Sequence, residues 1–503
     1  MASVAEASSR RSTHARILQS TAVIGLAGLI NIVMSIVRAK AVAVLLGPSG
    51  IGLFGVLSSL LDLVHAVGGV GVSSSGVRQI AQANGDGDRP RLALVVATVR
   101  LLSVALAVVA AAVVVLGAGP IALVSFGDDL HRAAVVTLSV AVLVRVAAQG
   151  ESAILQGMRR VGDLARVQIV SGLLATAATV AIVFAYGEDG VAWAVVAAAA
   201  AGGLVAWLYS RRVAVGFRRV PFSAVRAEAT GLLNLGAAFM IMGLLAATTA
   251  YAVRILITRD FGFDAAGLYQ AAWTVGGLYA GFVLQAMGTD FYPQLVALGA
   301  DDRAGTDLIN DQIRIGTLVA GPGVCATLTL APVILVVLYS TEFRAAESML
   351  RWLSLGMMLR VVSWPIGYIL IARGWKYTLL AVELTSATVY VALASVLIPL
   401  IGVDGAGIAF CLFYLWHTLV VFLVVWRRAA FGWRADTLVL VAAYLACAGG
   451  IFAAFELFGA TAGLVIGLSV TALASVHSAA RLAPLLPVAL PFVPALVRRF
   501  ARG

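Results

Sequence analysis

The chain has 503 residues, of which 61% are hydrophobic and only 12% are charged, and its mean hydropathy is +1.01. A soluble domain typically carries about 25% charged residues, so this composition excludes an ordinary soluble protein. It predicts an all-α protein that crosses a membrane many times. The formal net charge of +11 does not predict nucleic-acid binding, because basic residues in a membrane protein first of all set its orientation.

Apolar stretches follow one another along almost the whole chain. A bilayer core of about 30 Å is crossed by about 20 apolar residues in a helix. On this basis we predict about fourteen transmembrane helices, at 17–37, 52–76, 92–116, 133–157, 165–186, 190–209, 230–257, 266–297, 313–339, 347–371, 377–400, 404–426, 436–457 and 460–480.

An internal repeat organises these segments. The stretch from Gly47 to Phe54, Gly-x4-Gly-Leu-Phe, recurs from Gly262 to Tyr269 as Gly-x4-Gly-Leu-Tyr, at an offset of 215 residues. The same offset joins YGEDGVAWA at 186–194 to IGVDGAGIA at 401–409. A fixed period is the signature of a repeated architecture, and it predicts two six-helix halves followed by two further helices. We expect the glycine element to make a turn and a close packing contact rather than to bind a ligand.

The repeat and the charges together predict the organisation of the chain. In or beside the connections, eighteen Lys and Arg residues lie on one side and seven on the other, which predicts that both termini are cytoplasmic. Because each half then begins and ends on the same side, the repeats are parallel rather than inverted. The predicted parts are a cytoplasmic segment 1–16, a six-helix lobe 17–212, a cytoplasmic linker 213–229, a second six-helix lobe 230–428, two additional helices 429–480 and a cytoplasmic Pro- and Arg-containing tail 481–503.

Basic residues within or at the ends of the apolar spans are the first functional candidates. An ionisable group inside a membrane is costly, so it normally faces protein or a water-filled cavity. Arginine binds an anionic headgroup such as pyrophosphate through paired hydrogen bonds. We therefore predict a cationic substrate-binding cavity, in which Arg145 and Arg360 are equivalent in the repeat. For candidate arginines near helix ends, the alternative is that the side chain extends to the membrane interface. The candidates are Arg38, Arg78, Arg145, Arg254, Arg360 and Arg373.

Acidic residues within the spans are candidates for coupling to H+ or Na+. These are Asp62, Glu151, Asp290 and Glu383. The alternative for Asp62 and Asp290 is an ion pair with a neighbouring arginine, and the alternative for Glu151 is a pair with Arg145, six residues away. The five His and three Cys residues show no ligand spacing and no catalytic motif is recognisable, so we predict no metal, no cofactor and no enzyme activity.

Two regions carry a resemblance to a known family. The opening LQSTAVIGLAGLINIVMSIVRAKAVAVLLGPSGIGLFGVLSSL, the following GVR and QIAQ, and the segments WPIGYILIARGWKYTLLAVEL and LIPLIGVDGAGIAFCLFYLWH within 347–428 are the residues concerned. The chain resembles the O-antigen translocases, which are flippases of lipid-linked oligosaccharides in the multidrug/oligosaccharidyl-lipid/polysaccharide (MOP) exporter superfamily. The likeness covers most of residues 15–430.

The resemblance implies a V-shaped fold that works by alternating access. The substrate would be an undecaprenyl-pyrophosphate-linked O-antigen-type repeat unit, moved from the inner to the outer leaflet of a bacterial cytoplasmic membrane. An ion gradient or the membrane potential, rather than ATP, would drive the movement. The implied partners are the lipid-linked glycan, membrane lipids, a polysaccharide polymerase and a chain-length regulator, with no nucleic acid.

Three other functions are weighed against this interpretation. A lipid II flippase belongs to the same class, and the sequence does not exclude it. A drug antiporter of the superfamily typically has an acidic residue in its first helix, whereas residues 17–37 contain none. A polysaccharide polymerase or ligase usually displays a large external loop, whereas two of the predicted outward connections, 187–190 and 401–404, are only turns.

Overall fold

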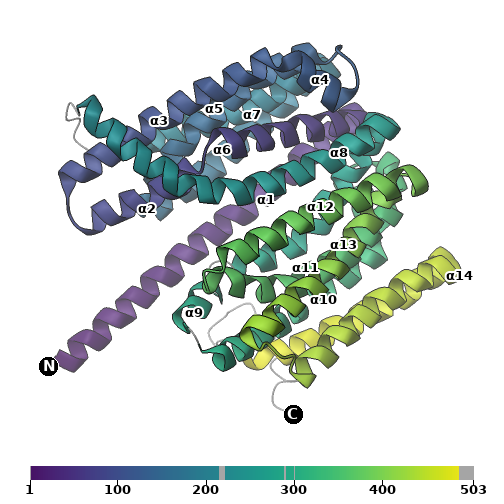
Figure 1. Cartoon of the computed structure of the whole chain (residues 1–503). Coiled ribbons are helices and arrows are strands. Elements are labelled where there is room, and N and C mark those ends of the chain that lie inside the picture. Colours follow the sequence, from purple (N-terminus) through teal and green to yellow (C-terminus); the bar gives the residue numbers. More distant parts are fainter. Residues whose placement is uncertain (1, 214–220, 288–290, 300, 486–503) are drawn as a thin grey trace. The chain divides into compact units, whose positions relative to one another are not determined.

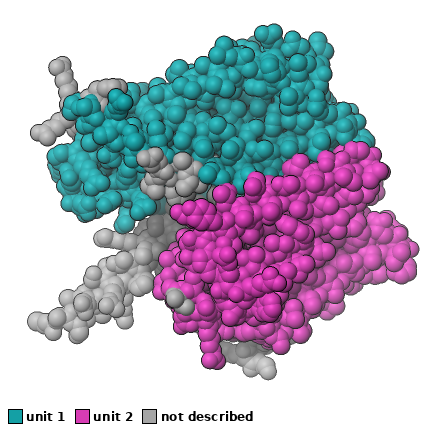
Figure 2. Space-filling view, viewed as in Figure 1, with its two compact units in different colours: residues 1–267 teal, residues 268–503 magenta. Residues whose placement is uncertain are grey.

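The structure is a computed structural model, and it describes residues 2–213, 221–287, 291–299 and 301–485 (Figure 1). Every regular element in these ranges is a helix, as the sequence predicts. The chain divides into two compact units, Met1–Gly267 and Leu268–Gly503 (Figure 2). The first unit therefore extends beyond the first six predicted spans, into residues that the repeat assigns to the second half.

Many helices are long and apolar enough to cross a membrane. The described part of the chain has nine such segments, and three of them, Gly25–Gly68, Val161–Ser210 and Ala435–Leu482, have 44, 50 and 48 residues. One crossing needs about 20 residues, and glycines with positive φ interrupt all three: Gly47, Gly187 and Gly459. The chain is a multi-pass membrane protein, while the count of fourteen crossings stays a prediction.

Unit 1 is a helical bundle in which α5 has a central place. Helix α5 packs against α3 and α7, while α1 runs along α6. The final helix of the unit is the part of α8 that ends at Gly267. In order, the helices are α1 (Ala2–Gly68), α2 (Val72–Gly85), α3 (Arg89–Leu116), α4 (Ala118–Phe126), α5 (Arg132–Gly157), α6 (Val161–Tyr186), α7 (Val191–Ser210) and α8 (Phe222–Ala286).

Unit 2 repeats this packing and adds α14. Helix α11 packs against α10 and α13 as α5 packs against α3 and α7, and α14 lies along α10. The apolar contact between α10 and α14 includes Leu328, Tyr444 and Ile451, all of which are buried. The helices are α9 (Tyr292–Ala297), α10 (Asp302–Leu338), α11 (Glu347–Ala372), α12 (Lys376–Ile401), α13 (Asp404–Ala429) and α14 (Ala435–Leu482).

The backbone confirms the 215-residue repeat in detail. Adding 215 to both ends of α5 gives both ends of α11, and the same holds for α6 and α12. Residues with positive φ recur at the same offset, in the pairs Gly47 and Gly262, Arg159 and Gly374, and Gly187 and Gly402. Arg159 adopts this backbone with a φ of 55°, where its equivalent Gly374 has 66°. The two halves thus share helix lengths and turn geometry.

The repeated glycine element makes a turn and then a close contact, as expected. Gly47 and Gly262 have φ and ψ of 67° and −162°, and 80° and −176°, a region that is essentially restricted to glycine. Each interrupts a long helix. Five residues later, Gly52 and Gly267 lie against one another: a Cβ on Gly52 would collide with the carbonyl oxygen of Phe263. A Cβ on Gly267 would likewise collide with the carbonyl oxygen of Pro48, which is the repeat equivalent of Phe263.

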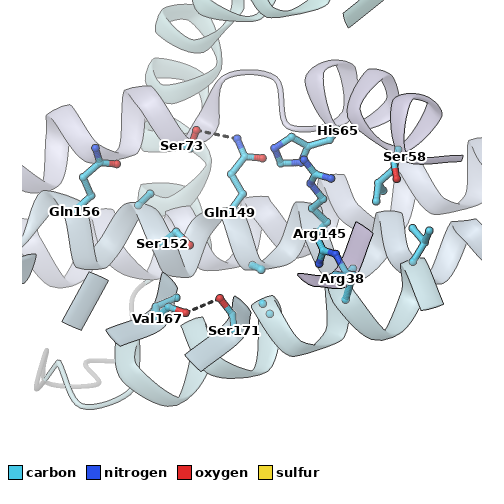
Figure 3. Close-up of a pocket in the computed structure, with 18 of the residues that line it drawn as sticks. Arg38, Ser58, His65, Ser73, Arg145, Gln149, Ser152, Gln156, Val167 and Ser171 are labelled. Atoms are coloured by element: carbon cyan, nitrogen blue, oxygen red, sulfur yellow. Dashed lines mark hydrogen bonds between the residues drawn. The ribbon is translucent and has the colours of Figure 1, made fainter. Parts of the chain in front are cut away.

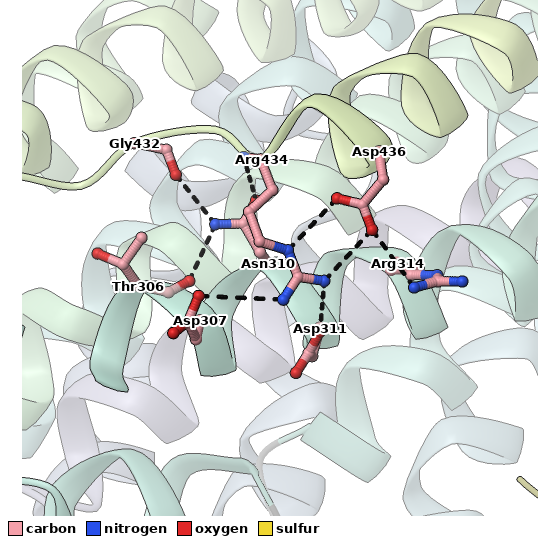
Figure 4. Close-up of polar contacts among 8 residues, drawn as sticks. All are labelled: Thr306, Asp307, Asn310, Asp311, Arg314, Gly432, Arg434 and Asp436. Atoms are coloured by element: carbon pink, nitrogen blue, oxygen red, sulfur yellow. Dashed lines mark hydrogen bonds and ion pairs between the residues drawn. The ribbon is translucent and has the colours of Figure 1, made fainter. Parts of the chain in front are cut away.

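A polar network fixes the start of α14 to α10 (Figure 4). Asn310 is fully buried and donates to the carbonyl oxygens of Thr306 and Gly432, at 2.9 and 3.0 Å. Its Oδ1 accepts from the backbone N–H of Arg434 at 3.0 Å. The Arg434 guanidinium in turn lies 2.7 Å from Asp311. Backbone groups of the connection before α14 are therefore satisfied by a side chain of α10.

We predict that Gly52→Ala destabilises the protein by about 1–3 kcal/mol, the usual effect of overpacking. The added methyl group meets the backbone carbonyl of Phe263, which cannot move as a side chain does. Gly28→Ala in the same helix is the control, because nothing lies within 4 Å of the added Cβ there, and alanine favours helices by up to about 1 kcal/mol. Thermal unfolding of the detergent-purified protein measures both. Equal melting temperatures for the two variants would contradict the packing argument.

We predict that Asn310→Leu lowers stability by about 1–3 kcal/mol for each buried group left without its hydrogen bond. Those groups are the N–H of Arg434 and the carbonyl of Gly432. The comparison is Asp307→Ala, which removes an exposed carboxylate 4.0 Å from Arg434 and should cost less than about 1 kcal/mol. Thermal unfolding, with protease cleavage near residues 430–434 as a second readout, distinguishes them. A larger loss for Asp307→Ala would overturn the assignment.

Candidate functional site

Unit 1 contains a cavity of about 620 Å³. Its walls come from α1, α5, α6 and α7, with Ser73 of α2 at its edge (Figure 3). Small residues of α7 form part of one wall and leave the space open. These are Ala198, Ala199, Gly202 and Gly203. The cavity therefore lies inside one compact unit and can be described without reference to the other.

Helix α5 supplies the polar wall of this cavity. Its lining residues include Arg145, Gln149, Ser152 and Gln156, which are spaced by four, three and four residues. Side chains at such spacing lie on one face of a helix. The buried apolar residues of α5 include Leu138, Val142, Val146, Ile154 and Leu155. Packing against α3 and α7 thus holds the polar face toward the cavity.

Arg38 and Arg145 form the cationic end of the cavity. Figure 3 shows the two side chains at the same end, with His65 beside them. Arg145 Nη2 lies 2.6 Å from Asp62 Oδ1, and the two side chains are 40% and 54% exposed. This confirms the ion-pair alternative for Asp62. An ion pair so accessible to solvent is weak, so an incoming anion can replace the carboxylate.

The alternative suggested for Glu151, an ion pair with Arg145, is wrong. Glu151 instead pairs with Arg100 of α3 at 3.2 Å and accepts a hydrogen bond from Ser210 of α7 at 2.5 Å. Six residues turn a helix by about 240° beyond a full turn, so Glu151 faces away from Arg145. The Arg100 and Glu151 side chains are 27% and 14% exposed. This pair ties α5 to its neighbours and lies apart from the cavity lining.

The remaining candidate site residues, in unit 1 and at helix ends, have surroundings that differ from those of Arg38 and Arg145. Arg78 of α2 is exposed and does not line this cavity. Arg254 of α8 is 9% exposed and donates to the carbonyl oxygen of Ala250 on its own helix at 3.1 Å. Arg373, at the end of α11, pairs with Asp302 at 2.6 Å. Asp290 lies outside the described residues.

Arg360 of unit 2 has aromatic rather than acidic partners. Its guanidinium lies 4.9 Å from the ring centroid of Trp364 and 5.9 Å from that of Tyr414. Within the described residues, Arg360 Nε is buried without a hydrogen-bond partner. Arg145 and Arg360 are thus equivalent in the backbone and different in their environment.

The sequence reasoning missed the uncharged part of the site. Besides the α5 residues, Ser58, Ser73 and Ser171 also line the cavity. The spacing of Gln149, Ser152 and Gln156 behind Arg145 is a signal that would have found them. Within the ranges that the structure describes, no group of three or more His, Cys, Asp or Glu residues is arranged to hold a metal ion.

Comparison with known proteins places the chain in a family. Residues 41–348 match the family described as "Polysaccharide biosynthesis protein". The chain belongs to this family. The chain is also 24% identical over 416 residues to the lipid III flippase of Escherichia coli (strain K12), a match that covers 80% of the chain and 97% of that relative. The lipid III flippase of Shigella flexneri matches with the same identity and coverage.

Solved structures of transporters share the fold. The lipid II flippase MurJ in an inward closed conformation aligns with a TM-score of 0.65 and 13% identity, covering 92% of this chain and 99% of that one. An inward-facing multidrug resistance MATE family transporter of the MOP superfamily aligns with a TM-score of 0.61 and 15% identity, covering 80% and 94%. The protein therefore has the MOP-type fold that the family resemblance of its sequence implied.

We predict that Glu151→Ala destabilises the protein more than Asp62→Ala does. The first change leaves the half-buried Arg100 without its carboxylate, which costs about 1–3 kcal/mol. The second removes an exposed partner of Arg145, and such pairs are worth less than about 1 kcal/mol. Thermal unfolding of both variants, with the double variant to test additivity, gives the comparison. A greater loss for Asp62→Ala would show that the cavity pair is a structural element.

Proposed function

We propose that this protein is a flippase that moves an undecaprenyl-pyrophosphate-linked oligosaccharide, an O-antigen-type repeat unit, from the inner to the outer leaflet of a bacterial cytoplasmic membrane. The match to relatives named lipid III flippase, over 97% of their length, supports a lipid-linked substrate. The intact substrate changes leaflet, so the proposal includes no catalysis. The charge bias of the connections supports cytoplasmic termini.

The cavity of unit 1 is the observation that carries this proposal. Two arginines, Arg38 and Arg145, line one end, and none of the described residues that line the cavity is Asp or Glu. Pyrophosphate presents several anionic oxygens, and the planar guanidinium donates paired hydrogen bonds to such groups. A cationic drug would meet like charge in the same place, which disfavours an antiporter of organic cations.

Asp62 gives the cavity an exchange mechanism. Without substrate, the carboxylate of Asp62 pairs with Arg145. A phosphate oxygen that displaces this carboxylate leaves Asp62 free to bind a cation, so we propose that Asp62 couples substrate binding to uptake of H+ or Na+. Glu151 is engaged with Arg100 and Ser210, which favours a structural role. Asp290 and Glu383 stay candidates on their sequence positions alone.

The second half contributes to the proposal through the repeat. Arg360 is the repeat equivalent of Arg145. Its guanidinium lies near the rings of Trp364 and Tyr414, and its buried Nε has no hydrogen-bond partner in the described chain. We propose that it also contacts the anionic substrate during transport. Arg78, Arg254 and Arg373 are secondary candidates for that role. On the outer side, a polysaccharide polymerase and a chain-length regulator would consume the delivered unit.

We predict that the protein restores surface glycan in a bacterial strain that lacks its own O-antigen flippase, and that Arg145→Ala and Arg38→Ala lower the rate of restoration by about tenfold or more. A hydrogen bond to a charged group contributes about 1.5–3 kcal/mol, and 1.4 kcal/mol corresponds to a factor of about ten. Glycan labelling over time, at equal protein levels, measures the rate. Arg427→Ala, at the exposed end of α13, is the matched control.

Three outcomes decide between functions. Full activity of both cavity variants would remove the cavity arginines from the mechanism. Failure of the well-expressed wild-type chain to restore glycan, together with rescue of a strain depleted of its lipid II flippase, would move the substrate to lipid II. Failure of both rescues, with efflux of a cationic drug, would replace the flippase by an antiporter.

A further inference from the structure

The cavity of unit 1 has two chemically different ends. The cationic end contains Arg38 and Arg145. The neutral end, which we define by Ser73, Gln149, Ser152, Gln156 and Ser171, has only hydroxyl and amide groups among its polar side chains. Figure 3 shows Gln156 at the left of the view and Arg38 to the right, with Ser152 and Gln149 between them.

The neutral end is longer than a pyrophosphate requires. At the usual rise per residue, Arg145 and Gln156 are separated by about 16 Å along α5. A bound pyrophosphate at the arginines would therefore leave a hydrogen-bonding wall beyond it. The small residues Gly202 and Gly203 of α7 also line the cavity and add no bulk. Whatever is attached to the pyrophosphate has both space and polar partners there.

The amide of Gln149 is fixed and only partly satisfied. Its Nε2 donates to Ser73 Oγ at 2.9 Å, while in the described structure its buried Oε1 has no hydrogen-bond partner. The amide also packs against Gly69, where any Cβ would collide with it. A buried acceptor without a partner is costly. Oε1 is enclosed where it lies against Gly69, so the amide has to turn for a ligand O–H or N–H group to reach this oxygen and remove that cost.

Sugars match this arrangement better than further anionic groups do. Sugar hydroxyl and acetamido groups are neutral donors and acceptors, like the amides and hydroxyls of the neutral end. A site built to hydrogen-bond a substrate discriminates strongly against an analogue that lacks those groups. We propose that the neutral end is the subsite for the sugar attached directly to the pyrophosphate, an uncharged hexose or acetamido sugar, with Gln149 as its main determinant. This inference rests on the proposed function.

The test compares two lipids on the purified full-length protein in lipid nanodiscs. One is undecaprenyl pyrophosphate, and the other is the same lipid carrying a single N-acetylglucosamine. The wild-type protein should bind the sugar-bearing lipid more tightly. Gln149→Leu should lower that preference by about tenfold, the effect of one well-placed hydrogen bond to a buried group, and leave the affinity for the sugar-free lipid unchanged. Arg145→Ala should weaken the binding of both lipids.

Further variants separate a sugar contact from a packing defect. Ser152→Ala and Gln156→Leu change the neutral end without touching the Ser73 hydrogen bond, and each should reduce the preference in the same direction. Gln168→Leu replaces an exposed glutamine of α6 that does not line the cavity, and it should bind both lipids as the wild type does.

The outcomes distinguish this inference from the proposed function. An equal loss of affinity for both lipids in Gln149→Leu would overturn the sugar subsite. An unchanged preference for the sugar-bearing lipid in all three neutral-end variants would also overturn it. Binding of both lipids with no preference by the wild type would also overturn it, while leaving a pyrophosphate-lipid flippase intact. Binding of neither lipid by the folded wild-type protein would overturn the proposed function and the subsite together.

Discussion

The close approach of Gly52 and Gly267 is the constraint on which the rest of unit 1 depends. Two backbones meet where neither residue has a side chain, and each glycine faces a carbonyl of the opposite helix. The approach is possible because Gly47 and Gly262 have already redirected those helices. Hydrophobic burial gives little direction inside a membrane, so close packing at small residues is what specifies how helices meet. The cavity forms beside helices that this contact orients.

Much of the fold was predictable because the repeated residues include glycines that determine the backbone conformation. Gly187 and Gly402 recur at the same offset and adopt the same kind of turn. By contrast, the short helix α4 (Ala118–Phe126) and the separate helix α2 (Val72–Gly85) have no repeated signal of this kind. Their apolar or mixed sequences continue neighbouring spans, and only the turns at Gly71 and Gly117 separate them. Composition and periodicity do not show where such turns occur.

The charges of the candidate site were predicted from the sequence, whereas its neutral groups were missed although their helical spacing behind Arg145 was a usable signal. Arg38 and Arg145 stand out because a charge is rare in an apolar span. Gln149 and Ser152 are uncharged polar residues, which a helical bundle accommodates at little energetic cost, so they do not stand out in the sequence. The alternative of a Glu151 pair with Arg145 was wrong because an ion pair depends on which helices pack together, and the actual partner, Arg100, is distant in the sequence. Spacing along one helix restricts such partners, while tertiary packing selects them.

The extension of unit 1 to Gly267 has a consequence for biosynthesis. Tyr251 of α8 bonds Ser125 at 2.5 Å, and Gly236 lies against the turn at Val70 and Gly71. Helices α1 to α7 therefore emerge from the ribosome before α8, the helix that completes their packing. More than half of the chain must therefore be synthesised before unit 1 can complete its packing, and until then the surfaces that α8 later covers have no partner from this unit.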